Sequence, residues 1–416
     1  IRRPPRSTQG VSSAASDVYK RQVKPRVTWS NLTNKDRNLV IPLGSTLGML
    51  GGGQIGGFFA EAALRFGYKV SVWDPSPNAP AKRFASMAFD APFDDVDTLK
   101  KFADVSDCAS LEWENVPVSL TDRLEKLIRV RPGSKSLGLA QDRTKEKHFL
   151  TENHIPVTKY AVINSPRELS TVRLALPWIV KTATLGYDGH GQWRISNAQD
   201  IACTEKVLTG DGPWVVEQVV PYKIELSVVV GYDGKTELVV FPPTENIHEN
   251  GILRISISPA RISTGIEKRA QELAQEVVKN IGDTGVFCVE MFLLENDELL
   301  VNEIAPRPHN SGHHTIDSFT VSQYELQIRA LVGLPLVDPQ QLTPSVLLNV
   351  LGEEYTNLID SDTANWILQN RNARIYSYGK PDVRPGRKMG HILFSGPSQE
   401  DLFSDALETH RVLTKA

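Results

Sequence analysis

The sequence lacks the features of a membrane protein, a disulfide-bonded protein or a nucleic-acid-binding protein. No apolar run approaches the roughly eighteen residues of a membrane-spanning helix. The three cysteines, Cys108, Cys203 and Cys288, are far apart and form no C-x-x-C motif, which excludes a disulfide framework and a cysteine zinc site. The 46 basic and 49 acidic residues give a net charge of -3, so no basic field indicates nucleic acid. These absences favour a cytoplasmic protein that acts on small molecules.

The composition that is present is that of a globular protein. The chain has 416 residues, enough for two or three domains, and is 40% apolar and 23% charged. Residues 1–22 differ, because they lack an initiator methionine, are rich in arginine and serine, and superficially look like a transit peptide. They resemble translated sequencing-adapter read-through and show no structural periodicity. We therefore expect them to be a non-native or disordered extension.

The stretch from Phe287 to His314 predicts a β-hairpin that brings two carboxylates together. If Asn296-Asp297 is a two-residue turn, Glu295 faces Glu298, Leu294 faces Leu299, and Glu290 lies opposite Glu303. Cys288, Phe292, Leu299 and Val301 would share the face of the two glutamates and cover it.

This pairing calls for a counter-ion. Two ionised groups roughly 5 Å apart repel by about 3 kcal/mol at an effective dielectric near 20. Mg²⁺ is the natural choice, because it takes one or two carboxylates and completes its shell with water and phosphate oxygens. The alternative is a longer turn and a register slipped by one residue, with the two glutamates on opposite faces as ordinary solvated side chains.

The loop that follows Glu303 has the composition of an oxyanion site. It combines one guanidinium, three imidazoles, an amide and a hydroxyl between prolines and glycine. These groups belong to Arg307, His309, His313, His314, Asn310 and Ser311.

The first ordered segment predicts a βαβ unit. A strand at 46–50 leads into a glycine turn at 51–57, a helix to about Phe66 and a second strand at 69–73. The G-x-G-x-x-G spacing is compatible with a nicotinamide cofactor, a nucleotide phosphate or merely a tight turn. Further on, Glu114 and Asn115 are expected at the carboxyl edge of the sheet, where ligands bind, unless they cap the helix that starts at Pro117.

A second unit begins near Gln141 with a helix that carries lysines at Lys145 and Lys147. The strand 178–181 ends on Lys181, and the glycine-rich segment 182–192 then predicts a lid whose amides fold over phosphates while Lys181 supplies a charge. No G-K-[ST] follows, so this is not a Walker A loop. Its alternative is a flexible hairpin loop.

Two further segments complete the predicted nucleotide site. The extended segment 214–221 offers its backbone to an adenine edge, and Glu225 is a candidate acceptor for ribose hydroxyls, although Glu217 and Glu225 are also compatible with strand-edge charges. Residues 244–251 are expected to form a polar turn before a strand at 252–255, and a helix is expected from about Ile266 to Ile281.

The closing segment predicts an anion site. A strand near 346–352 is followed by a basic turn at 380–391 and a strand at 392–394. Lys380, Arg384, Arg387 and Lys388 fall within nine residues around Pro385-Gly386. This density fits a compact anion site, with a solvated charge run as the alternative.

Together these motifs resemble the ATP-grasp fold and, more closely, the 5-(carboxyamino)imidazole ribonucleotide synthetase family of biotin-independent carboxylating ligases in purine biosynthesis. The resemblance covers roughly residues 45–395. It is carried by LGMLGGGQIG, KTATLGYDGHGQW, VEQ, NIHENGILR, VNEIAPRPHNSGHH and VRPGRKMGH.

The resemblance implies a mixed α/β and α+β fold in three domains. These are a Rossmann-like pre-ATP-grasp domain at 38–140, an ATP-grasp domain at 141–335 and a small β-rich C-terminal domain at 336–416. The glycine turn would then belong to a substrate domain, not to a nicotinamide site.

The resemblance also implies site residues. The ATP-binding residues would be Arg143, Lys181, Gly186, Tyr187, Asp188, Gly189, His190, Gly191, Gln192, Glu217, Gln218, Val219, Val220, Glu225, His248, Asn302 and Glu303. The Mg²⁺ ligands would be Glu290 and Glu303. The catalytic residues would be Arg307, His309, Lys388 and Tyr187. The substrate-binding residues would be Gly53, Gln54, Glu114, Asn115, Asn310, Ser311, Lys380, Arg384, Arg387 and Lys388.

The implied reaction carboxylates 5-aminoimidazole ribonucleotide. Bicarbonate attacks the γ-phosphate of ATP to give carboxyphosphate, and the exocyclic amine then takes the carboxyl group, leaving ADP and phosphate. Leu185 stands where relatives often carry glycine, which stiffens the expected lid. The family further implies a homodimer and, because no mutase region follows, a separate mutase that acts on the product.

Three alternatives remain open. The first is another ATP-grasp ligase, such as a formate-dependent glycinamide ribonucleotide transformylase. The second is an NAD-dependent oxidoreductase built on the glycine turn. The third is a nucleotide-binding protein without turnover.

Overall fold

The computed structural model describes residues 40–184, 186, 191–208 and 212–415. Up to residue 140 its elements are β1 (Thr46–Leu50), α2 (Gln54–Arg65), β2 (Lys69–Trp73), η3 (Pro80–Phe84), β3 (Met87–Phe89), α3 (Val96–Val105), β4 (Cys108–Leu111), α4 (Val118–Leu124), β5 (Arg129–Val130) and α5 (Ser134–Ala140). From there to residue 258 they are α6 (Arg143–Glu152), β6 (Tyr160–Ile163), η4 (Pro166–Thr171), β7 (Trp178–Thr182), β8 (Gln192–Ile195), α7 (Ala198–Val207), β9 (Trp214–Gln218), β10 (Tyr222–Tyr232), β11 (Leu238–Val240), β12 (Thr244–Glu249) and β13 (Ile252–Ser258). The remainder are α8 (Thr264–Ile281), β14 (Gly285–Leu294), β15 (Leu299–Ala305), η5 (Asn310–Gly312), α9 (Thr315–Ser318), α10 (Gln323–Val332), β16 (Ser345–Leu351), α11 (Gly352–Leu358), α12 (Ser361–Gln369), β17 (Ala373–Ser377), β18 (Lys388–Ser395) and α13 (Gln399–Thr414).

The first region is a parallel sheet in the order β3-β2-β1-β4-β5, which confirms the expected Rossmann-like fold. Side chains of β1 and β2 pack against α2. The same hydrophobic core includes Tyr324, Ile328 and Leu331 from α10, a helix that begins 250 residues after the end of β2 at Trp73. Arg131 Nη1 donates to the carbonyl of Ala330 at 2.8 Å, near the negative end of the α10 dipole. Packing of α10 and this hydrogen bond therefore hold the parallel sheet to the rest of the chain.

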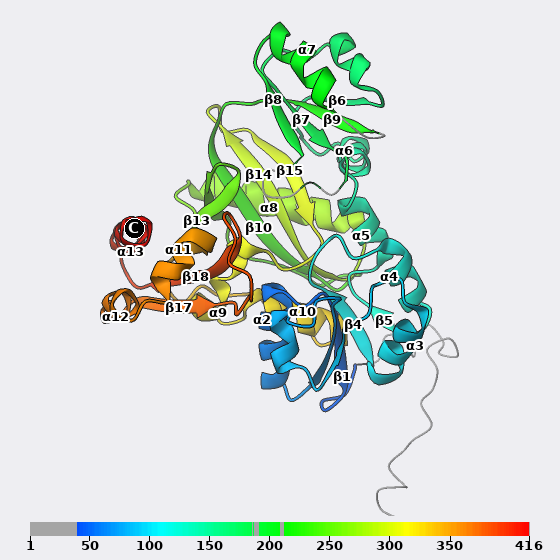
Figure 1. The fold of residues 1–416 in the computed structure, drawn as a ribbon, viewed down its shortest axis with the longest axis vertical. Helices are drawn as coiled ribbons and strands as arrows, with labels where there is room; N and C mark the ends of the chain where they lie inside the picture. Colours follow the sequence, from blue (N-terminus) through cyan, green and yellow to red (C-terminus); the bar gives the residue numbers. More distant parts are fainter. Residues whose placement is uncertain (1–39, 185, 187–190, 209–211, 416) are drawn as a thin grey trace, which may run out of the picture. The chain divides into compact units, whose positions relative to one another are not determined.

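The largest sheet runs β15-β14-β10-β12-β13-β16-β18-β17, with β11 beside β10. Helix α8 packs on it (Figure 1), burying Ala270, Ala274 and Val277 against Val289 and Met291 of the sheet. Ser263 caps the start of α8, and Gly282, with φ of +68°, ends it.

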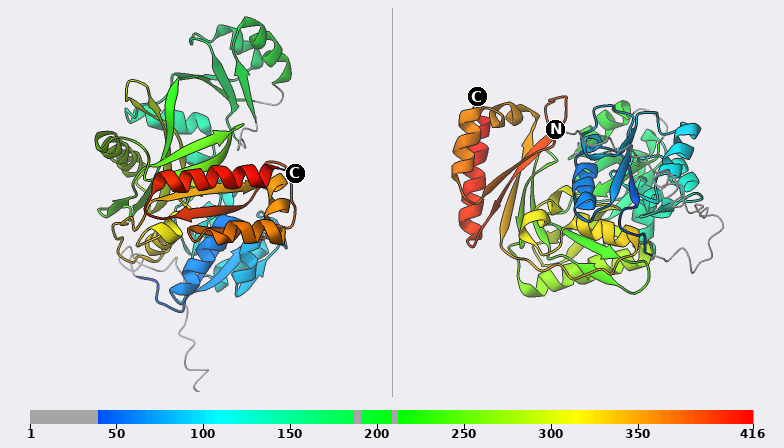
Figure 2. Two further views of the ribbon diagram at one scale, coloured as in Figure 1. Left: turned by 90° about the vertical axis from the view of Figure 1, so that its left-hand side faces the viewer. Right: turned by 90° about the horizontal axis from the view of Figure 1, so that it is seen from below.

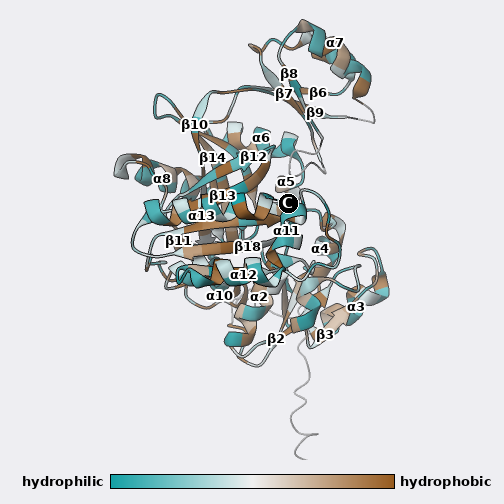
Figure 3. Cartoon of the chain, turned by 60° about the vertical axis from the view of Figure 1, so that its left-hand side comes forward, coloured by the Kyte–Doolittle hydropathy of each residue, from teal (hydrophilic) through white to brown (hydrophobic). Residues whose placement is uncertain are grey.

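The expected C-terminal β-rich region adds its strands to this same sheet. β16 pairs with β13 and β18, while α12 and α13 lie along the C-terminal strands (Figure 2). Most of β18 is coloured as hydrophobic in Figure 3, in keeping with the burial of Ile392, Leu393 and Phe394. One continuous hydrogen-bonded sheet therefore joins the central and C-terminal regions.

A smaller antiparallel sheet, β6-β9-β7-β8, carries the expected lid segment between β7 and β8. Trp178, Val180 and Trp214 fill its core. Residues 185 and 187–190 of the lid lie outside the described residues.

The polar turn expected at 244–251 is wrong in its extent. Residues Thr244–Glu249 form strand β12, which pairs with β13 through the turn Asn250-Gly251. Both turn residues have positive φ, +52° and +79°, as a two-residue type I′ hairpin requires. The Asn-Gly pair signals this hairpin, and the polar side chains of β12 mask it.

The glycine turn after β1 uses its amides internally. Gly52 N donates to Asp74 Oδ2 at 2.8 Å, and Gly53 N donates to Glu112 Oε2. A Cβ at Gly53 would overlap the Glu112 carboxylate, so a larger residue here would displace that side chain from the Gly53 amide. The amides that a dinucleotide phosphate needs are thus paired with carboxylates, which argues against the nicotinamide alternative.

Within the described residues, no helix is both long enough and apolar enough to span a membrane. This agrees with the absence of long apolar runs in the sequence.

Replacing Glu112 will change how stability depends on pH. Burial is the main cause that raises the pKa of Glu112 to about 7, against the opposing Gly53 amide. The folded pKa lies above the unfolded one near 4.5, so this contribution is fully present below pH 4.5 and is lost as pH rises through 7. The difference corresponds to about 3 kcal/mol.

We expect the free energy of unfolding of Glu112→Gln to fall less than that of the parent chain between pH 5 and pH 8, because these two pH values bracket the pKa of about 7. Urea unfolding at the two pH values measures this. The control is Glu295→Gln, which changes an exposed carboxylate at a hairpin tip. Glu125 does not serve, because it is partly buried and binds Ser134. Parallel pH profiles for Glu112→Gln and the parent would show that Glu112 is ordinarily ionised.

Candidate active site

The predicted pairing of Glu290 with Glu303 is confirmed: the two residues are direct partners across β14 and β15. The predicted tip is wrong. Leu293, not Leu294, lies opposite Leu299, and Leu294 N donates to Glu298 O at 2.9 Å across a three-residue loop. Asp297 ends that loop at φ of +64°, the left-handed residue that such loops require. A bulge at Asn302 then restores the predicted pairing.

The bulge also changes which residues share a face with the glutamates. Leu299 and Val301 pack in the core beneath α8 with Met291, so their predicted place beside the glutamates is wrong. Because the extra residue shifts the alternation by one, Glu303 points to the opposite face from Val301. Phe292, stacked on Tyr222 at 4.7 Å between ring centroids, lines the glutamate side.

The two carboxylates have different surroundings. Glu303 Oε2 is 2.9 Å from Arg143 Nη1, while Glu290 Oε1 is 3.4 Å from His309 Nε2. Burial and then the charge of Glu303 raise the pKa of Glu290. Burial acts in the same direction on Glu303, but the charges of Arg143 and Lys181, with the hydrogen bond from Arg143, together lower the pKa of Glu303 to about 2. Close carboxylates with separated pKa values are typical of a functional site.

The residues around the pair fit a divalent cation. Asn302 Oδ1 is buried and has no hydrogen-bond partner among the described residues, and Asn302 lines the same cleft as Glu290. Carboxylate and amide oxygens are ligands that Mg²⁺ accepts. No group of three or more His, Cys, Asp or Glu side chains suited to a metal occurs in the described part of the chain. A cation here would thus take its other ligands from phosphate and water.

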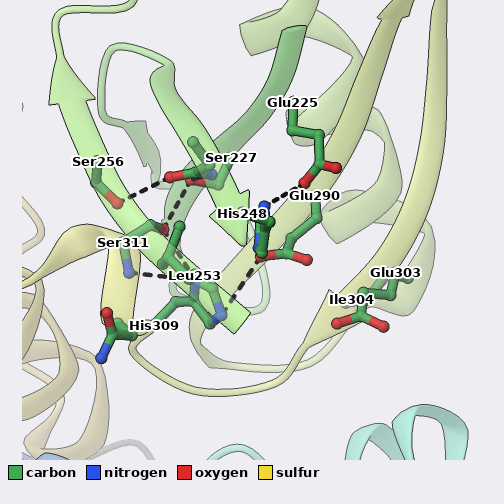
Figure 4. Close-up of polar contacts among 12 residues, drawn as sticks. Glu225, Ser227, His248, Leu253, Ser256, Glu290, Glu303, Ile304, His309 and Ser311 are labelled. Carbon is green, nitrogen blue, oxygen red and sulfur yellow. Dashed lines mark hydrogen bonds and ion pairs between the residues drawn. The ribbon is translucent and has the colours of Figure 1, made fainter. Parts of the chain in front are cut away.

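A second polar pair lies beside Glu290, on the same side of the sheet. His248 Nδ1 on β12 lies 2.5 Å from Glu225 Oε2 on β10. Figure 4 shows Glu225, His248 and Glu290 close together, with Glu303 on the neighbouring strand. The cleft that Glu225, Glu290 and Asn302 line leaves essentially no open volume between their side chains. Typical ligand pockets hold roughly 300–1,000 Å³, so entry of a nucleotide requires the cleft to widen.

The smaller sheet contributes a buried ionic triad. Lys181 Nζ is 2.7 Å from Glu217 Oε2, and Lys147 Nζ on α6 is 3.2 Å from Glu217 Oε1. Burial opposes ionisation of Glu217, but Lys181 and then Lys147 outweigh it and lower the pKa of Glu217 to about 2. The carboxylate therefore lies between two lysines and not at a strand edge.

The backbone of 214–221 is only partly available to a ligand. β9 is paired on both sides, Gln218 N donates to Lys159 O, and Val219 N donates to Pro177 O, both at 2.9 Å. The predicted adenine contact is therefore limited to Val220 and to carbonyl groups near the end of the strand. Arg143 Nη2 also donates to Gly186 O at 3.4 Å, and Gln192 begins β8 opposite Lys181. The predicted residues Tyr187, Asp188, Gly189 and His190 lie outside the described residues.

The loop after β15 is held in place by the parallel-sheet region. Arg307 Nε and Nη2 each donate to the Glu114 carboxylate at 2.6 Å. Burial works against the charge of Arg307, but the charge and hydrogen bond of Glu114, with smaller contributions from other neighbours, together raise the pKa of Arg307. Neither Glu114 nor Asn115 caps α4, which has no side-chain cap. A predicted catalytic residue and a predicted substrate-binding residue are thus brought together.

His309 is the imidazole of this loop that faces the carboxylates. Gln323 brackets its backbone, accepting from His309 N at 2.9 Å and donating to His309 O at 2.7 Å. His309 Nδ1 is 2.8 Å from Ser311 Oγ. Burial, followed by the charges of Arg307 and Lys388, lowers the pKa of His309 well below its usual range. The ring is therefore neutral at physiological pH.

The other two imidazoles do not serve the oxyanion site that the loop composition suggests. His313 Nδ1 is 2.7 Å from Tyr324 OH, and His314 Nε2 is 3.0 Å from Thr244 Oγ1, both in the interior. Asn310 Oδ1 accepts from Asn349 Nδ2 at 2.8 Å, and Ser311 is bound to Ser227. Asn310 and Ser311 are 4% and 0% exposed, so the structure gives them internal partners.

The basic turn of the C-terminal region divides into two parts. Lys380 Nζ donates to Lys388 O at 2.7 Å, and its charge lowers the pKa of Glu112 against the raising effect of burial. The charge of Lys388 likewise lowers the pKa of Glu290 against burial. Arg384 and Arg387 instead contact Asp382, at 3.2 and 3.7 Å.

Sequence reasoning missed Glu112 and the buried charges of α6. Glu112 directly follows β4, at the sheet edge where ligands bind, and lies beside Gly53 and near Lys380. Its position after the strand is the signal that could have identified it. Glu146 and Lys147 carry no such signal, because their spacing is ordinary for a solvated helix.

Comparison with known families covers most of the chain. A family model described as "Ribonucleotide synthetase preATP-grasp domain" matches residues 45–141. One described as "ATP-grasp domain" matches residues 148–324, and one described as "Phosphoribosylaminoimidazole carboxylase C-terminal domain" matches residues 345–404.

Full-length relatives and solved structures agree with these matches. The N5-carboxyaminoimidazole ribonucleotide synthase of Bacillus subtilis (strain 168) is 38% identical over 367 residues, which is 88% of this chain and 95% of the relative. A solved ADP complex of N5-carboxyaminoimidazole ribonucleotide synthetase superposes with a TM-score of 0.85 at 34% identity, covering 89% of this chain and 98% of the other.

The Aspergillus clavatus synthase in complex with ADP and 5-aminoimidazole ribonucleotide has a TM-score of 0.81 at 31% identity, covering 91% and 100% of the two chains. The chain therefore belongs to the N5-carboxyaminoimidazole ribonucleotide synthase family.

Proposed function

We propose that this protein uses ATP and bicarbonate to carboxylate 5-aminoimidazole ribonucleotide in purine biosynthesis, and that the residues named below carry the reaction. The observation that carries the residue assignment is the Glu290–Glu303 pair, set between Arg143 on one side and His309 on the other. Acidic ligands for a cation beside cationic groups for phosphate are what a phosphoryl-transfer site needs.

The nucleotide would lie between the small sheet and the large one. Lys181 and Arg143 supply positive charge to its phosphates, and Glu225 with His248 receives the ribose hydroxyls. Both cations are held by carboxylates, Lys181 by Glu217 and Arg143 by Glu303. These ion pairs keep the side chains extended toward the cleft before a nucleotide enters, which reduces the ordering cost of binding.

Glu290, Glu303 and the Asn302 amide oxygen would hold Mg²⁺. When bound, the cation neutralises charge that develops on the γ-phosphate. The ionised Glu303 and the free Asn302 oxygen are already suited to it. Burial and the charge of Glu303 raise the pKa of Glu290, so binding of a cation here would compete with protonation of this carboxylate.

The chemistry has two substitutions. A bicarbonate oxygen attacks the γ-phosphorus, the bond to the β-phosphate oxygen breaks and ADP leaves. The amine nitrogen of the ribonucleotide then attacks the carboxyphosphate carbon and phosphate leaves. Positioning and charge stabilisation account for most of such catalysis.

The residues of the loop and of the basic turn would serve the second step. Arg307, which Glu114 fixes in place, and Lys388 stabilise the negative charge of carboxyphosphate, with Tyr187 assisting. His309 is neutral, so it is able to accept the proton that the amine loses. Lys380 and Arg387 would hold the ribonucleotide phosphate, near the glycine turn that carries Gly53.

The active cleft must also exclude water, because hydrolysis of carboxyphosphate would waste ATP. From the family resemblance we further propose a cytoplasmic homodimer and a separate mutase that consumes the product.

The reaction itself is tested by omitting one substrate at a time. We expect ADP release to require both 5-aminoimidazole ribonucleotide and bicarbonate, and to be unaffected by formate or glycinamide ribonucleotide. A coupled assay for ADP, with mass detection of the carboxylated product, measures this. ADP release that ignores the ribonucleotide would falsify the proposal.

Glu303→Gln tests the cation site. Removing the ionised carboxylate should lower kcat by about 100-fold or more, since ligand and outer-sphere changes at metal sites cost 10–100-fold or greater. Glu298→Gln, at the exposed tip of the same hairpin, is the matched control and should keep the parent rate. Steady-state kinetics over a Mg²⁺ titration separate the two, and a Glu303→Gln variant with parental kcat removes Glu303 from the metal site.

A further inference from the structure

Strand β15 is an edge strand, and its outer side at the bulge is held by helix α6. Lys147 Nζ donates to Asn302 O at 2.9 Å, and Ile304 N donates to Glu146 Oε1 at 2.6 Å. Between these two backbone contacts, Arg143 binds the Glu303 carboxylate. Three successive residues of β15 are thus each bound by one side chain of α6.

The spacing on α6 explains how one helix makes all three contacts. Arg143, Glu146 and Lys147 stand at positions i, i+3 and i+4, which share one helix face. Asp142 caps the helix by accepting from Thr144 N, so the face starts at a fixed point. On the opposite side, Lys145 and His148 are exposed.

Burial makes this arrangement unusual. Glu146 is 2% exposed and Lys147 is 1% exposed, although such side chains are rarely buried unless paired. An apolar side chain would cover a sheet edge without burying charge, but it would leave the Asn302 carbonyl and the Ile304 amide without partners. The buried charges therefore match the unpaired backbone groups of a bulge.

Without the bulge, the register at the hairpin tip would continue and Glu290 would lie opposite Asn302. The tip pairs Leu293 with Leu299 and Met291 with Val301, one residue out of step with the Glu290–Glu303 pair. Such a slip would turn Glu303 toward the core beneath α8. The alignment of the two carboxylates depends on the bulge staying at Asn302.

Lys147 also joins this bulge to the smaller sheet. The same ammonium group lies 3.2 Å from Glu217 Oε1, and the other oxygen of Glu217 holds Lys181. A single buried side chain thus connects the strand that carries Glu303 with the strand that faces the nucleotide.

We propose that Glu146 and Lys147 are positioning residues: they fix the β15 bulge so that Glu303 stays opposite Glu290, and Lys147 aligns this pair with Glu217 and Lys181. This inference rests on the proposed role of Glu290 and Glu303 as ligands of the cation that accompanies the nucleotide. Neither residue touches the reacting atoms.

The test compares Lys147→Met with Lys145→Met, an exposed lysine of the same helix. Lys147→Met should lower kcat/KM for ATP by about 10-fold or more and raise the Mg²⁺ concentration for half-maximal activity, as expected for residues that orient metal ligands. KM for the ribonucleotide should stay at the parent value. Lys147→Arg, which keeps the charge and the donors, should recover part of the loss, and Lys145→Met should match the parent.

A second pair of variants tests the hydrogen bond that Glu146 accepts from the backbone amide of Ile304. Glu146→Gln keeps a carbonyl oxygen for Ile304 N, whereas Glu146→Met removes it, so the Met variant should be the more impaired of the two. Calorimetric titration with ADP, with and without Mg²⁺, gives a readout that is independent of turnover. Lys147→Met and Glu146→Met should weaken Mg²⁺-dependent ADP binding several-fold more than metal-free binding.

Three outcomes decide the matter. Selective loss of Mg²⁺-dependent binding supports the positioning role. Equal loss of metal-dependent and metal-free binding, or a lower melting temperature with parental Mg²⁺ dependence, overturns it in favour of a purely structural role. Failure of the proposed function is separate, because it shows in the parent chain as ADP release that does not need the ribonucleotide.

Discussion

Electrostatic repulsion between two carboxylates is the constraint on which this site depends. Glu290 and Glu303 are direct cross-strand partners, and folding holds them there although they repel. The two carboxylates differ in how they are stabilised. Arg143 stabilises the charge of Glu303, while Glu290 lies beside the neutral imidazole of His309. The two carboxylates are thus already opposed across the strands, although the cleft beside them must widen before a nucleotide enters.

The same logic extends outward from the pair. Two cationic groups near the cleft are held by carboxylates from other elements, Lys181 by Glu217 and Arg307 by Glu114, and the His248 ring lies beside Glu225. Such pairs fix long side chains in place and limit the entropy lost on binding. The Arg307–Glu114 pair also links the parallel-sheet region to the loop after β15, whereas each of the other two pairs lies within one sheet.

Sequence patterns predicted the elements better than their contacts. The strands at 46–50 and 69–73 and the cross-strand glutamates follow from apolar periodicity and turn residues. The Glu290–Glu303 pairing was predicted correctly although the predicted turn was wrong. The real loop is one residue longer, which shifts the register by one, and the bulge at Asn302 shifts it back. The roles of Glu146, Lys147 and His313 could not be read, since burial of a polar side chain depends on elements far away in the chain.

The continuous sheet from β15 to β17 has a mechanical consequence. Lys388 on β18 and Glu290 on β14 belong to one hydrogen-bonded body, whereas Lys181 and Glu217 belong to a separate sheet. In the proposed reaction, Lys388, which would stabilise carboxyphosphate, and the residues that hold the cation would therefore belong to one continuous sheet. Phosphoryl transfer and carboxylation would then take place against the same set of hydrogen-bonded strands, while the small sheet would contact the nucleotide alone.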